Sequence, residues 1–223
     1  EKLEYLRGLD KRRDEIRSLI DAQEKLTDEI NLALDKAATL SELEDIYRPY
    51  RPKRKTRASI AKEKGLEPLA NNILKQEKGF DPSKSAVDYI DEEKGVTSVE
   101  DAIQGAMDII AELVSDNAEI RKRIRNLTNA NGVLVSVATD EEKDSVYKNY
   151  YDYKEPVKKI AGHRVLAVNR GEKEGFLKVS VETDSEKPLN SIFRAMITDK
   201  NQLCSDIIRE ACTDAYQRLI YPS

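Results

Sequence analysis

Apolar residues recur at spacings of three and four through most of the first 130 residues, and this period predicts a series of amphipathic helices. The longest runs extend from Leu3 to Ile20 and from Val99 to Leu113. A further run, from Leu203 to Ile220, predicts a helix at the end of the chain. The pattern therefore favours a mainly α fold, built as an elongated scaffold of many helices.

Capping residues and prolines mark where the shorter helices begin and end. Ser, Thr and Asp side chains accept hydrogen bonds from the free backbone N–H groups of a first helical turn, and proline fits the first helical position. By these signals we expect helices to begin at Thr27, at Ser41, after Thr56, after Glu67 and after Asp81. Pro49 and Pro52 end the helix that Ser41 opens, because proline lacks a backbone donor and restricts the residue before it.

Residues 57–76 predict two short helices joined by a tight turn, similar to a helix-turn-helix. Ala61 supplies the small residue that such a motif needs where its helices cross, and Gly65 permits the turn. The second helix would enter the major groove of DNA. It offers two Asn and one Lys but no Arg, which makes it a poor reader of bases. A packed helical corner with no part in recognition is an equal alternative.

The pattern changes in the second half of the chain. Val133–Val137 and Phe176–Val181 are β-branched or alternating, which predicts strands. Between them, Glu141–Tyr150 favours a helix, whereas His163–Arg170 fits a helix and a strand equally. We therefore divide the chain into a helical region, 1–130, and a mixed helical region with two short strands, 131–223.

Composition excludes several classes of protein. Of the 223 residues 36% are charged, and 38 Lys and Arg against 42 Asp and Glu give a net charge of -4. Proteins that coat nucleic acid are usually basic over most of their surface, so any such contact here must be a local patch. No apolar run approaches the roughly 20 residues of a membrane span, so no membrane partner is expected.

Catalytic and metal chemistry find little support. Cys204 and Cys212 lie eight positions apart in a predicted helix, a separation of about 12 Å at the helical rise of about 1.5 Å per residue. That is too far for a disulfide, so both are expected to be free thiols. His163 has no second ligand at metal-binding spacing and is expected to cap or to hydrogen-bond in the core. We expect no catalytic residue, no metal, no cofactor and no enzymatic activity.

The strongest local feature is a basic segment around two prolines. Residues 48–64 hold eight Lys and Arg against Glu63 alone, a local charge of +7 in a chain of net charge -4. The prolines hold the segment extended, so its cations point outward and suit phosphate neutralisation, and Tyr47 and Tyr50 would add stacking on bases. The candidate nucleic-acid-binding residues are Arg48, Arg51, Lys53, Arg54, Lys55, Arg57 and Lys62.

An alternative stays open for these cations. The segment would also suit docking on acidic residues of the same molecule or of another domain. A second basic run, Arg121–Arg125, lies on a predicted helix. Such runs are usually solvated faces, and Asp116 and Glu119 one turn upstream offset part of its charge.

Two stretches are more specific than charge and period explain. The first is LEDIYRPYRPKRKTRASIAKEKGLEPLA, residues 43–70, and the second is HRVLAVNRGEKEGFL, residues 163–177. Asp91–Val96 and Tyr151–Pro156 match in the right order between them. With these stretches the whole chain, least closely at residues 184–200, resembles the N-terminal part of the bacterial Tex family of transcription accessory proteins.

The resemblance implies a cytoplasmic, transcription-associated protein that binds RNA or DNA. In that family this region is a helical scaffold with a helix-turn-helix-like element. A nuclease-like YqgF domain without working catalytic residues, a helix-hairpin-helix pair and an OB-fold RNA-binding domain would follow Ser223. The chain begins with Glu1, so we expect a fragment of a longer protein. The other domains and RNA polymerase are then its expected partners.

These observations lead to two hypotheses of function. The first is a scaffold module with auxiliary, sequence-nonspecific nucleic-acid binding through the basic segment. The second is a protein-interaction module that docks on the family's other domains or on RNA polymerase and has no nucleic-acid affinity of its own.

Overall fold

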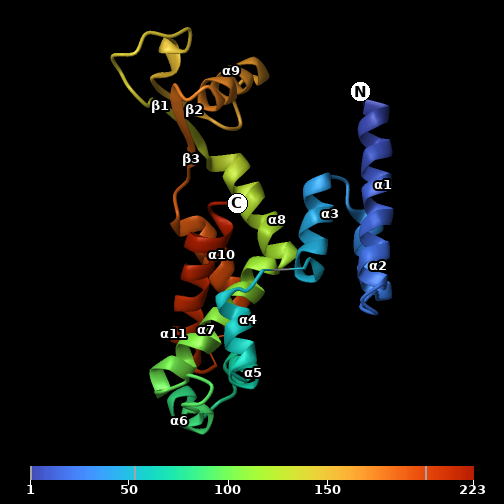
Figure 1. Cartoon of the computed structure of the whole chain (residues 1–223), viewed down its shortest axis with the longest axis vertical. Coiled ribbons are helices and arrows are strands. Elements are labelled where there is room, and N and C mark those ends of the chain that lie inside the picture. The colour runs from blue at the N-terminus through green and yellow to red at the C-terminus, as the bar shows by residue number, and fades with distance from the viewer. Residues whose placement is uncertain (1, 53, 199) are drawn as a thin grey trace. The chain divides into compact units, whose positions relative to one another are not determined.

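The computed structural model describes residues 2–52, 54–198 and 200–223, which pack as two compact units. The first unit contains the chain up to Lys122 together with Ile192–Ser223, and the second contains Arg123–Ser191. Helices dominate the chain and a small sheet lies in its second half, so the predicted fold class is confirmed (Figure 1). A domain boundary at residue 130 stays a prediction, because packed units are not by themselves independently folding domains.

The helices and strands have the following bounds. The α-helices of the first unit and its borders are α1 (Lys2–Asp21), α2 (Asp28–Lys36), α3 (Leu40–Tyr47), α4 (Arg57–Glu63), α5 (Glu67–Lys75), α6 (Pro82–Ala86), α7 (Val99–Asp116), α8 (Ala118–Asn131), α10 (Glu186–Met196) and α11 (Gln202–Asp214), which continues as a π-helical turn over Ala215–Ile220. The second unit holds β1 (Val133–Ala138), β2 (Asp152–Pro156), α9 (Gly162–Lys173) and β3 (Leu177–Glu182). Short 3₁₀ turns cover Arg48–Tyr50, Val87–Tyr89 and Lys148–Tyr150.

Side-chain caps fix where several helices start. Thr27 and Asp81 cap α2 and α6, as the sequence predicts. The prediction that Ser41 opens α3 is wrong, because Thr39 caps that helix by accepting a hydrogen bond of 3.3 Å from Glu42 N. The Glu42 carboxylate in turn accepts one of 2.8 Å from the backbone just before the cap. The capping bonds therefore form two residues earlier than expected.

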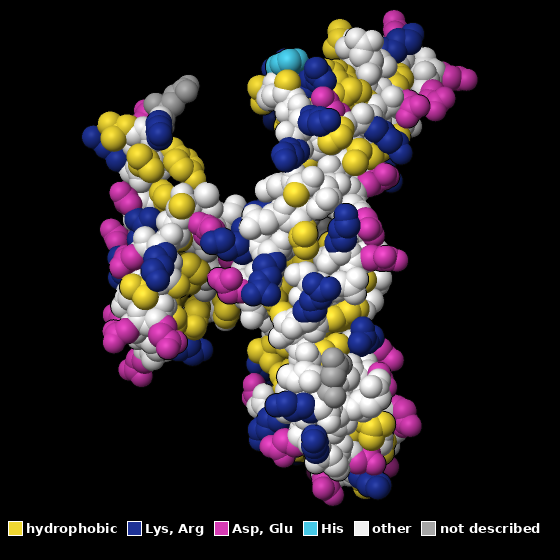
Figure 2. Space-filling view, turned by 180° about the vertical axis from the view of Figure 1, so that it is seen from behind, with side chains coloured by type: hydrophobic (Ala, Val, Ile, Leu, Met, Phe, Trp, Pro, Cys, Tyr) yellow, Lys and Arg dark blue, Asp and Glu magenta, His cyan; other side chains and the backbone are white. Residues whose placement is uncertain are grey.

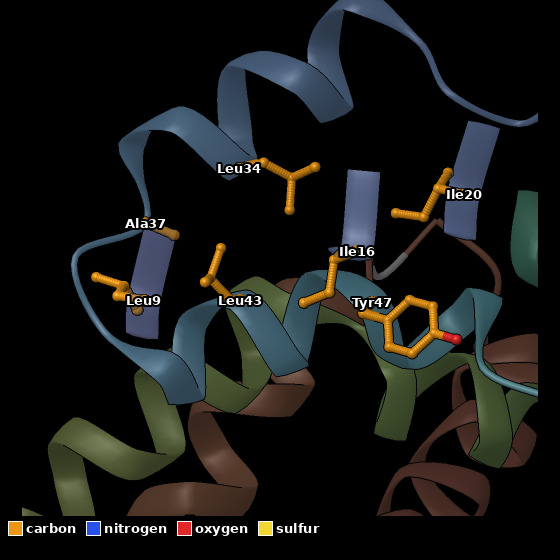
Figure 3. Packing of buried hydrophobic residues seen from close by; sticks show 7 residues of the cluster. All are labelled: Leu9, Ile16, Ile20, Leu34, Ala37, Leu43 and Tyr47. Atoms are coloured by element: carbon orange, nitrogen blue, oxygen red, sulfur yellow. The ribbon is translucent and has the colours of Figure 1, made fainter. Parts of the chain in front are cut away.

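Helices α1, α2 and α3 share an apolar core (Figure 3). Its members are Leu9, Ile16, Ile20, Leu34, Ala37, Leu43 and Tyr47. Leu3, Leu6 and Leu19 belong to the predicted stripe of α1 but are exposed. Arg13 completes the packing by donating to two carbonyls at the C-terminus of α2, at 2.9 and 3.1 Å. Helix α1 is thus held by its central and C-terminal turns.

Helix α7 is the centre of packing for the rest of the first unit, because α4, α5, α6 and α11 all contact it. The turn between α4 and α5 approaches α7 closely. Gly65 adopts a φ of +85° in that turn, and Leu66 beside it is buried. A Cβ at Gly105 of α7 would lie 2.3 Å from Leu66 Cδ1 and 3.4 Å from Ala61 Cβ. The two helices predicted from residues 57–76 are therefore present, and glycine at position 105 lets them approach.

Side-chain hydrogen bonds of Gln76 and Asn201 join the end of α5 to the segment before α11. Gln76 is buried and adopts a φ of +51°. Its side chain donates to Met196 O at 2.9 Å and accepts from Thr198 N at 2.9 Å. Asn201 donates to Glu77 O and Phe80 O, both at 2.7 Å. These bonds satisfy the backbone where the chain returns to the first unit.

The second unit is built on an antiparallel sheet of order β2-β1-β3. Strand β1 pairs with both neighbours, Leu134 lying opposite Val181 and Glu155. Helix α9 packs on β3. Gly171 of α9 lies so close to the sheet that a Cβ there would meet Leu177 Cδ1 at 2.6 Å.

Three expectations for this unit change. The two predicted strands are present, but the sequence missed β2. Residues 163–170, which fitted helix and strand equally, are helical. The helix predicted for Glu141–Tyr150 is wrong, because only Lys148–Tyr150 of that stretch is helical, as a 3₁₀ turn. Asp140 instead accepts a hydrogen bond of 3.0 Å from Glu142 N, and the like charges three and four residues apart in this acidic stretch disfavour a helix.

The close approach at Gly105 predicts the effect of a single methyl group. Gly105→Ala overpacks the contact with Leu66, whereas Gly8→Ala on α1 adds a Cβ with nothing within 4 Å. Both changes gain similar helix propensity. Gly105→Ala should therefore have an unfolding free energy about 1–3 kcal/mol below that of Gly8→Ala, measured by urea denaturation. Equal stability of the two variants would mean that the α4–α5 turn does not press on α7.

Candidate nucleic-acid interface

The basic segment runs between α3 and the first turns of α4. Arg48–Tyr50 forms a 3₁₀ turn, so the expectation of a fully extended segment is wrong there, and the backbone becomes extended at Arg51. Thr56 then caps α4 in a reciprocal box with Ser59, with bonds of 3.0 and 2.8 Å. Lys53 lies outside the described residues.

The first two cations of the segment have partners in their own unit. Arg48 Nε lies 3.3 Å from Asp116 Oδ1 at the end of α7. Arg51 pairs with Glu44 on α3, and its guanidinium lies 5.6 Å from the centre of the Tyr47 ring. Hydrogen bonding to Arg12 is the main cause that lowers the pKa of Glu44, with the Arg51 charge acting in the same direction. Arg48 and Arg51 are therefore structural contacts as well as cations.

Tyr47 does not present its ring to a base. It is buried, and the guanidinium groups of Arg12 and Arg51 lie 5.7 and 5.6 Å from its ring centre. The expectation that Tyr47 stacks on nucleic acid is wrong, because the ring belongs to the α1–α3 core. Tyr50 packs against the same core and is half-buried.

The later cations of the segment face water. Lys55 Nζ lies 3.4 Å from Glu63 and Lys62 Nζ lies 3.2 Å from Glu67, both in exposed pairs. Pairs of this kind are worth about 0–1 kcal/mol and exchange readily. Arg54 and Arg57 are exposed and make no ion pair with any residue of 2–52, 54–198 and 200–223. Arg54, Lys55, Arg57 and Lys62 are thus available to bind a ligand from solvent.

The Arg57 charge still reaches one neighbouring acid. Asp108 of α7 is partly buried, and burial raises the pKa of its carboxyl. The charges of Arg57 and Arg218 act in the opposite direction and favour the carboxylate. Arg57 therefore contributes to the electrostatics of α7 while its side chain stays exposed.

The second basic run is not a plain solvated face. Arg121 Nε lies 3.0 Å from Asp45 Oδ1, and the two side chains are only 11% and 8% exposed. Arg121 also donates to Ser115 O at 3.3 Å and to Ser223 Oγ at 2.9 Å. Lys122 pairs with Glu42 at 2.9 Å. The pairs with Asp45 and Glu42 attach α3 to the junction of α7 and α8, and no local sequence signal predicts them because Asp45 and Arg121 are 76 residues apart.

An apolar groove lies beside this fastening. It has a volume of about 610 Å³ and is lined by α2, α3 and the α7–α8 junction. Ile30, Leu32, Ala33, Ile46 and Tyr50 supply much of its surface. Leu32 is 56% exposed. A groove of this composition suits a protein segment better than a polyanion.

The helix-turn-helix-like pair offers little to a base edge. Asn71 and Lys75 of α5 are exposed, and Lys75 donates to the Asn72 side chain at 3.2 Å. Lys64, in the turn, donates to Gly95 O at 2.7 Å. That this pair reads bases poorly stays a prediction.

Other chemistry has few groups to draw on. Across the described ranges no three His, Cys, Asp or Glu side chains are grouped to hold a metal. Nor does any helix in those ranges have the length and apolar character to cross a membrane. Cys204 and Cys212 are buried free thiols, and burial raises the pKa of Cys212 to about 12. His163 is exposed at the start of α9, so the expected capping or core role is wrong.

Comparison with known proteins identifies the family of the chain. A family model described as Tex central region-like matches residues 77–220. The uncharacterized protein YdcI of Bacillus subtilis is 42% identical over 226 residues, covering 100% of this chain and 31% of that protein. The transcriptional accessory protein Tex of Neisseria gonorrhoeae is 35% identical over 184 residues, 82% of this chain and 24% of that protein. The human S1 RNA-binding domain-containing protein 1 is 26% identical over 238 residues, 99% and 23% respectively. The chain thus spans a third or less of the length of these relatives.

The buried ion pair between Asp45 and Arg121 predicts a large loss of stability when the Asp45 side chain is truncated. Asp45→Ala leaves the Arg121 charge buried without its carboxylate, which should lower the unfolding free energy by about 3–5 kcal/mol. Glu63→Ala removes the exposed partner of Lys55 and should cost about 0–1 kcal/mol. Denaturant unfolding of both variants measures the difference. A loss for Asp45→Ala no larger than that for Glu63→Ala would show that other contacts hold α3.

Proposed function

Since the chain belongs to the Tex family, we propose that it is a scaffold module of a transcription accessory protein whose basic segment makes an auxiliary, sequence-nonspecific contact with RNA or DNA. The helical architecture and its small sheet serve to hold that segment and the surfaces around it. The protein acts in the cytoplasm as a non-enzymatic partner of nucleic acid, with the rest of the longer protein and RNA polymerase as further partners.

One observation carries the nucleic-acid part of the proposal. Arg54 and Arg57 are exposed and have no ion-pair partner in the described ranges, and Lys55 and Lys62 are held only by exposed carboxylates. A phosphate backbone displaces such weak partners easily, because binding also releases its condensed counterions. We call Arg54, Lys55, Arg57 and Lys62 the outer cations.

Arg48 and Arg51 position the outer cations. Arg48 is fastened to Asp116 and Arg51 to Glu44 and Tyr47, so the backbone between α3 and α4 starts from a fixed place. A held backbone lets flexible side chains reach phosphates without first ordering the chain, which lowers the entropic cost of binding. Replacing Arg48 or Arg51 should therefore act through stability as well as affinity.

The contact neutralises phosphates and does not read sequence. Tyr47 is buried, and α5 presents Asn71 and Lys75 without an arginine to grip a guanine edge. Phosphate contacts of this kind position a protein on nucleic acid and carry no sequence information. The name of the human relative, an S1 RNA-binding domain-containing protein, favours RNA among the two polymers.

A protein-interaction module without nucleic-acid affinity is the second candidate, and one observation favours it. The groove of about 610 Å³ beside α2 and α3 exposes Leu32 and would accept an apolar segment of a protein. In that case the outer cations would meet acidic side chains of the same partner.

Reversing two outer cations tests the first candidate. Arg54→Glu/Arg57→Glu should weaken binding of a short labelled single-stranded RNA and of a DNA duplex by about 10-fold at low salt. The slope of log affinity against log salt should become shallower by about 1 or more, because fewer counterions are released. Fluorescence anisotropy titrations over a range of salt concentrations measure both quantities.

The matched control is Lys11→Glu/Lys78→Glu, which makes the same change in net charge at two exposed residues of the first unit away from the segment. This control should bind with nearly the affinity of the unchanged chain. Equal losses in the two double variants would reduce the effect to overall charge and contradict the proposal. Absence of binding to either probe at low salt, by a folded chain, would favour the protein-interaction candidate.

A further inference from the structure

A stretch that carries several cations and no acidic residue lies in the second unit of the chain. Residues 156–171 contain no Asp or Glu, although the chain holds 42 of them. The same stretch carries Lys158, Lys159, His163, Arg164 and Arg170, a local charge of +4 from Lys and Arg alone. We call these five residues the α9 patch. It includes the start of the block at residues 163–177, to which neither hypothesis of function assigns a role.

The sheet holds the loop that carries the two lysines. Pro156 ends β2 opposite Val133 of β1. Val157 N then donates to Gly132 O at 2.8 Å, and the next turn closes with Lys159 N donating to Pro156 O at 2.8 Å. Lys158 and Lys159 are both exposed. Their backbone is thus fixed by hydrogen bonds while their side chains remain in water.

Glu155, the acid closest in sequence to the two lysines, already has partners. Arg164 Nη1 donates to both carboxylate oxygens of Glu155 at 2.8 Å, and Tyr153 donates its hydroxyl to the same carboxylate. Hydrogen bonding by Tyr153, with that by Arg164, lowers the pKa of Glu155 and keeps it ionised. Glu155 is therefore engaged by Arg164 and Tyr153, and within 2–52, 54–198 and 200–223 neither Lys158 nor Lys159 forms an ion pair.

The exposed face of α9 extends the same charge. His163, Leu166 and Arg170 are exposed and lie three to four residues apart on that face. No side chain caps the N-terminus of the helix, and its positive end begins three residues after Lys159. Figure 2 shows the cyan histidine side chain with Lys and Arg side chains beside it.

We propose that the α9 patch is a second phosphate-binding surface, which contacts the backbone of a nucleic acid independently of the basic segment. Two flexible lysines, an arginine and the uncapped N-terminus of a helix of 12 residues all favour compact anions carrying several acceptor oxygens. A phosphate chain offers such anions at regular spacing, whereas an acidic protein surface offers scattered carboxylates. The surface does not need the basic segment, because its residues all belong to the second unit.

Charge reversal at the two lysines tests the proposal. Lys158→Glu/Lys159→Glu should weaken binding of a short single-stranded RNA and of a DNA duplex by about 10-fold at low salt and make the salt slope shallower by about 1–2. The matched control is Lys148→Glu/Lys178→Glu. Those exposed lysines belong to the opposite end of the sheet, since Lys178 pairs with Val137 and Lys148 precedes β2. The control changes net charge equally and should change affinity little.

Combining this variant with Arg54→Glu/Arg57→Glu separates the two surfaces. Losses in binding free energy that add would support two independent contacts. A loss in Lys158→Glu/Lys159→Glu with none in Arg54→Glu/Arg57→Glu would support the α9 patch and contradict the proposed role of the basic segment. Affinity equal to that of the control would overturn the proposal. Unchanged nucleic-acid binding together with weakened binding of polyglutamate would also overturn it, in favour of an acidic protein partner.

Discussion

The buried ion pair between Asp45 and Arg121 fastens α3 to the junction of α7 and α8, and the course of the basic segment depends on that attachment. A buried pair costs desolvation energy and contributes to stability only when its remaining donors are satisfied. Arg121 meets this condition through Ser115 O and Ser223 Oγ. The segment leaves α3 a few residues after Asp45, and Arg48 then reaches Asp116 on the same junction. The Asp45–Arg121 pair therefore fixes both α3 and the start of the basic segment that follows it.

Burial and ion pairing divide the cations of that chain into two kinds. Arg48 and Arg51 use their charge inside the first unit, on Asp116, Glu44 and the Tyr47 ring. The outer cations meet either water or exposed carboxylates. A count of charge along the sequence treats all of them alike. The structure separates them by position along the segment: Arg48 and Arg51, before Pro52, pair with Asp116 and Glu44, whereas Arg54 and the cations that follow it pair at most with exposed carboxylates of α4 and α5.

Local signals in the sequence predict much of the fold. The period of apolar residues, the caps at Thr27 and Asp81, and Gly65 in its left-handed turn are all properties of a few neighbouring residues. Thr39 and Glu42 have the same capping-box spacing as Ser41 and Glu44, so the local sequence does not decide which pair caps α3. The outer cations were likewise visible as charge.

Long-range partners decide what the sequence could not show. Asp45 and Arg121 are 76 residues apart, and nothing near either one predicts the other. Strand β2 is short and polar, and its inward Glu155 is acceptable only because Arg164 of α9 meets it. The sequence suggested that the ring of Tyr47 stacks on bases, but the ring is buried in the core of α1, α2 and α3.

Net acidity does not prevent a chain of this kind from meeting a polyanion. At physiological ionic strength the Debye length is about 8 Å, so a phosphate responds mainly to the charges next to it. The acids that give the chain its charge of -4 are interspersed with Lys and Arg over the face seen in Figure 2, where their fields largely cancel. Residues 48–64 and 156–171 are two places where acids are too few to cancel the cations locally, with one acid and none. Residues 120–139 also lack acids, but Arg121 and Lys122 of that stretch pair with Asp45 and Glu42. The overall charge instead opposes nonspecific coating, because repulsion grows with every further contact that a long polyanion makes outside these two surfaces. A chain with this charge pattern can bind phosphates at residues 48–64 and 156–171 without attracting nucleic acid over the rest of its surface.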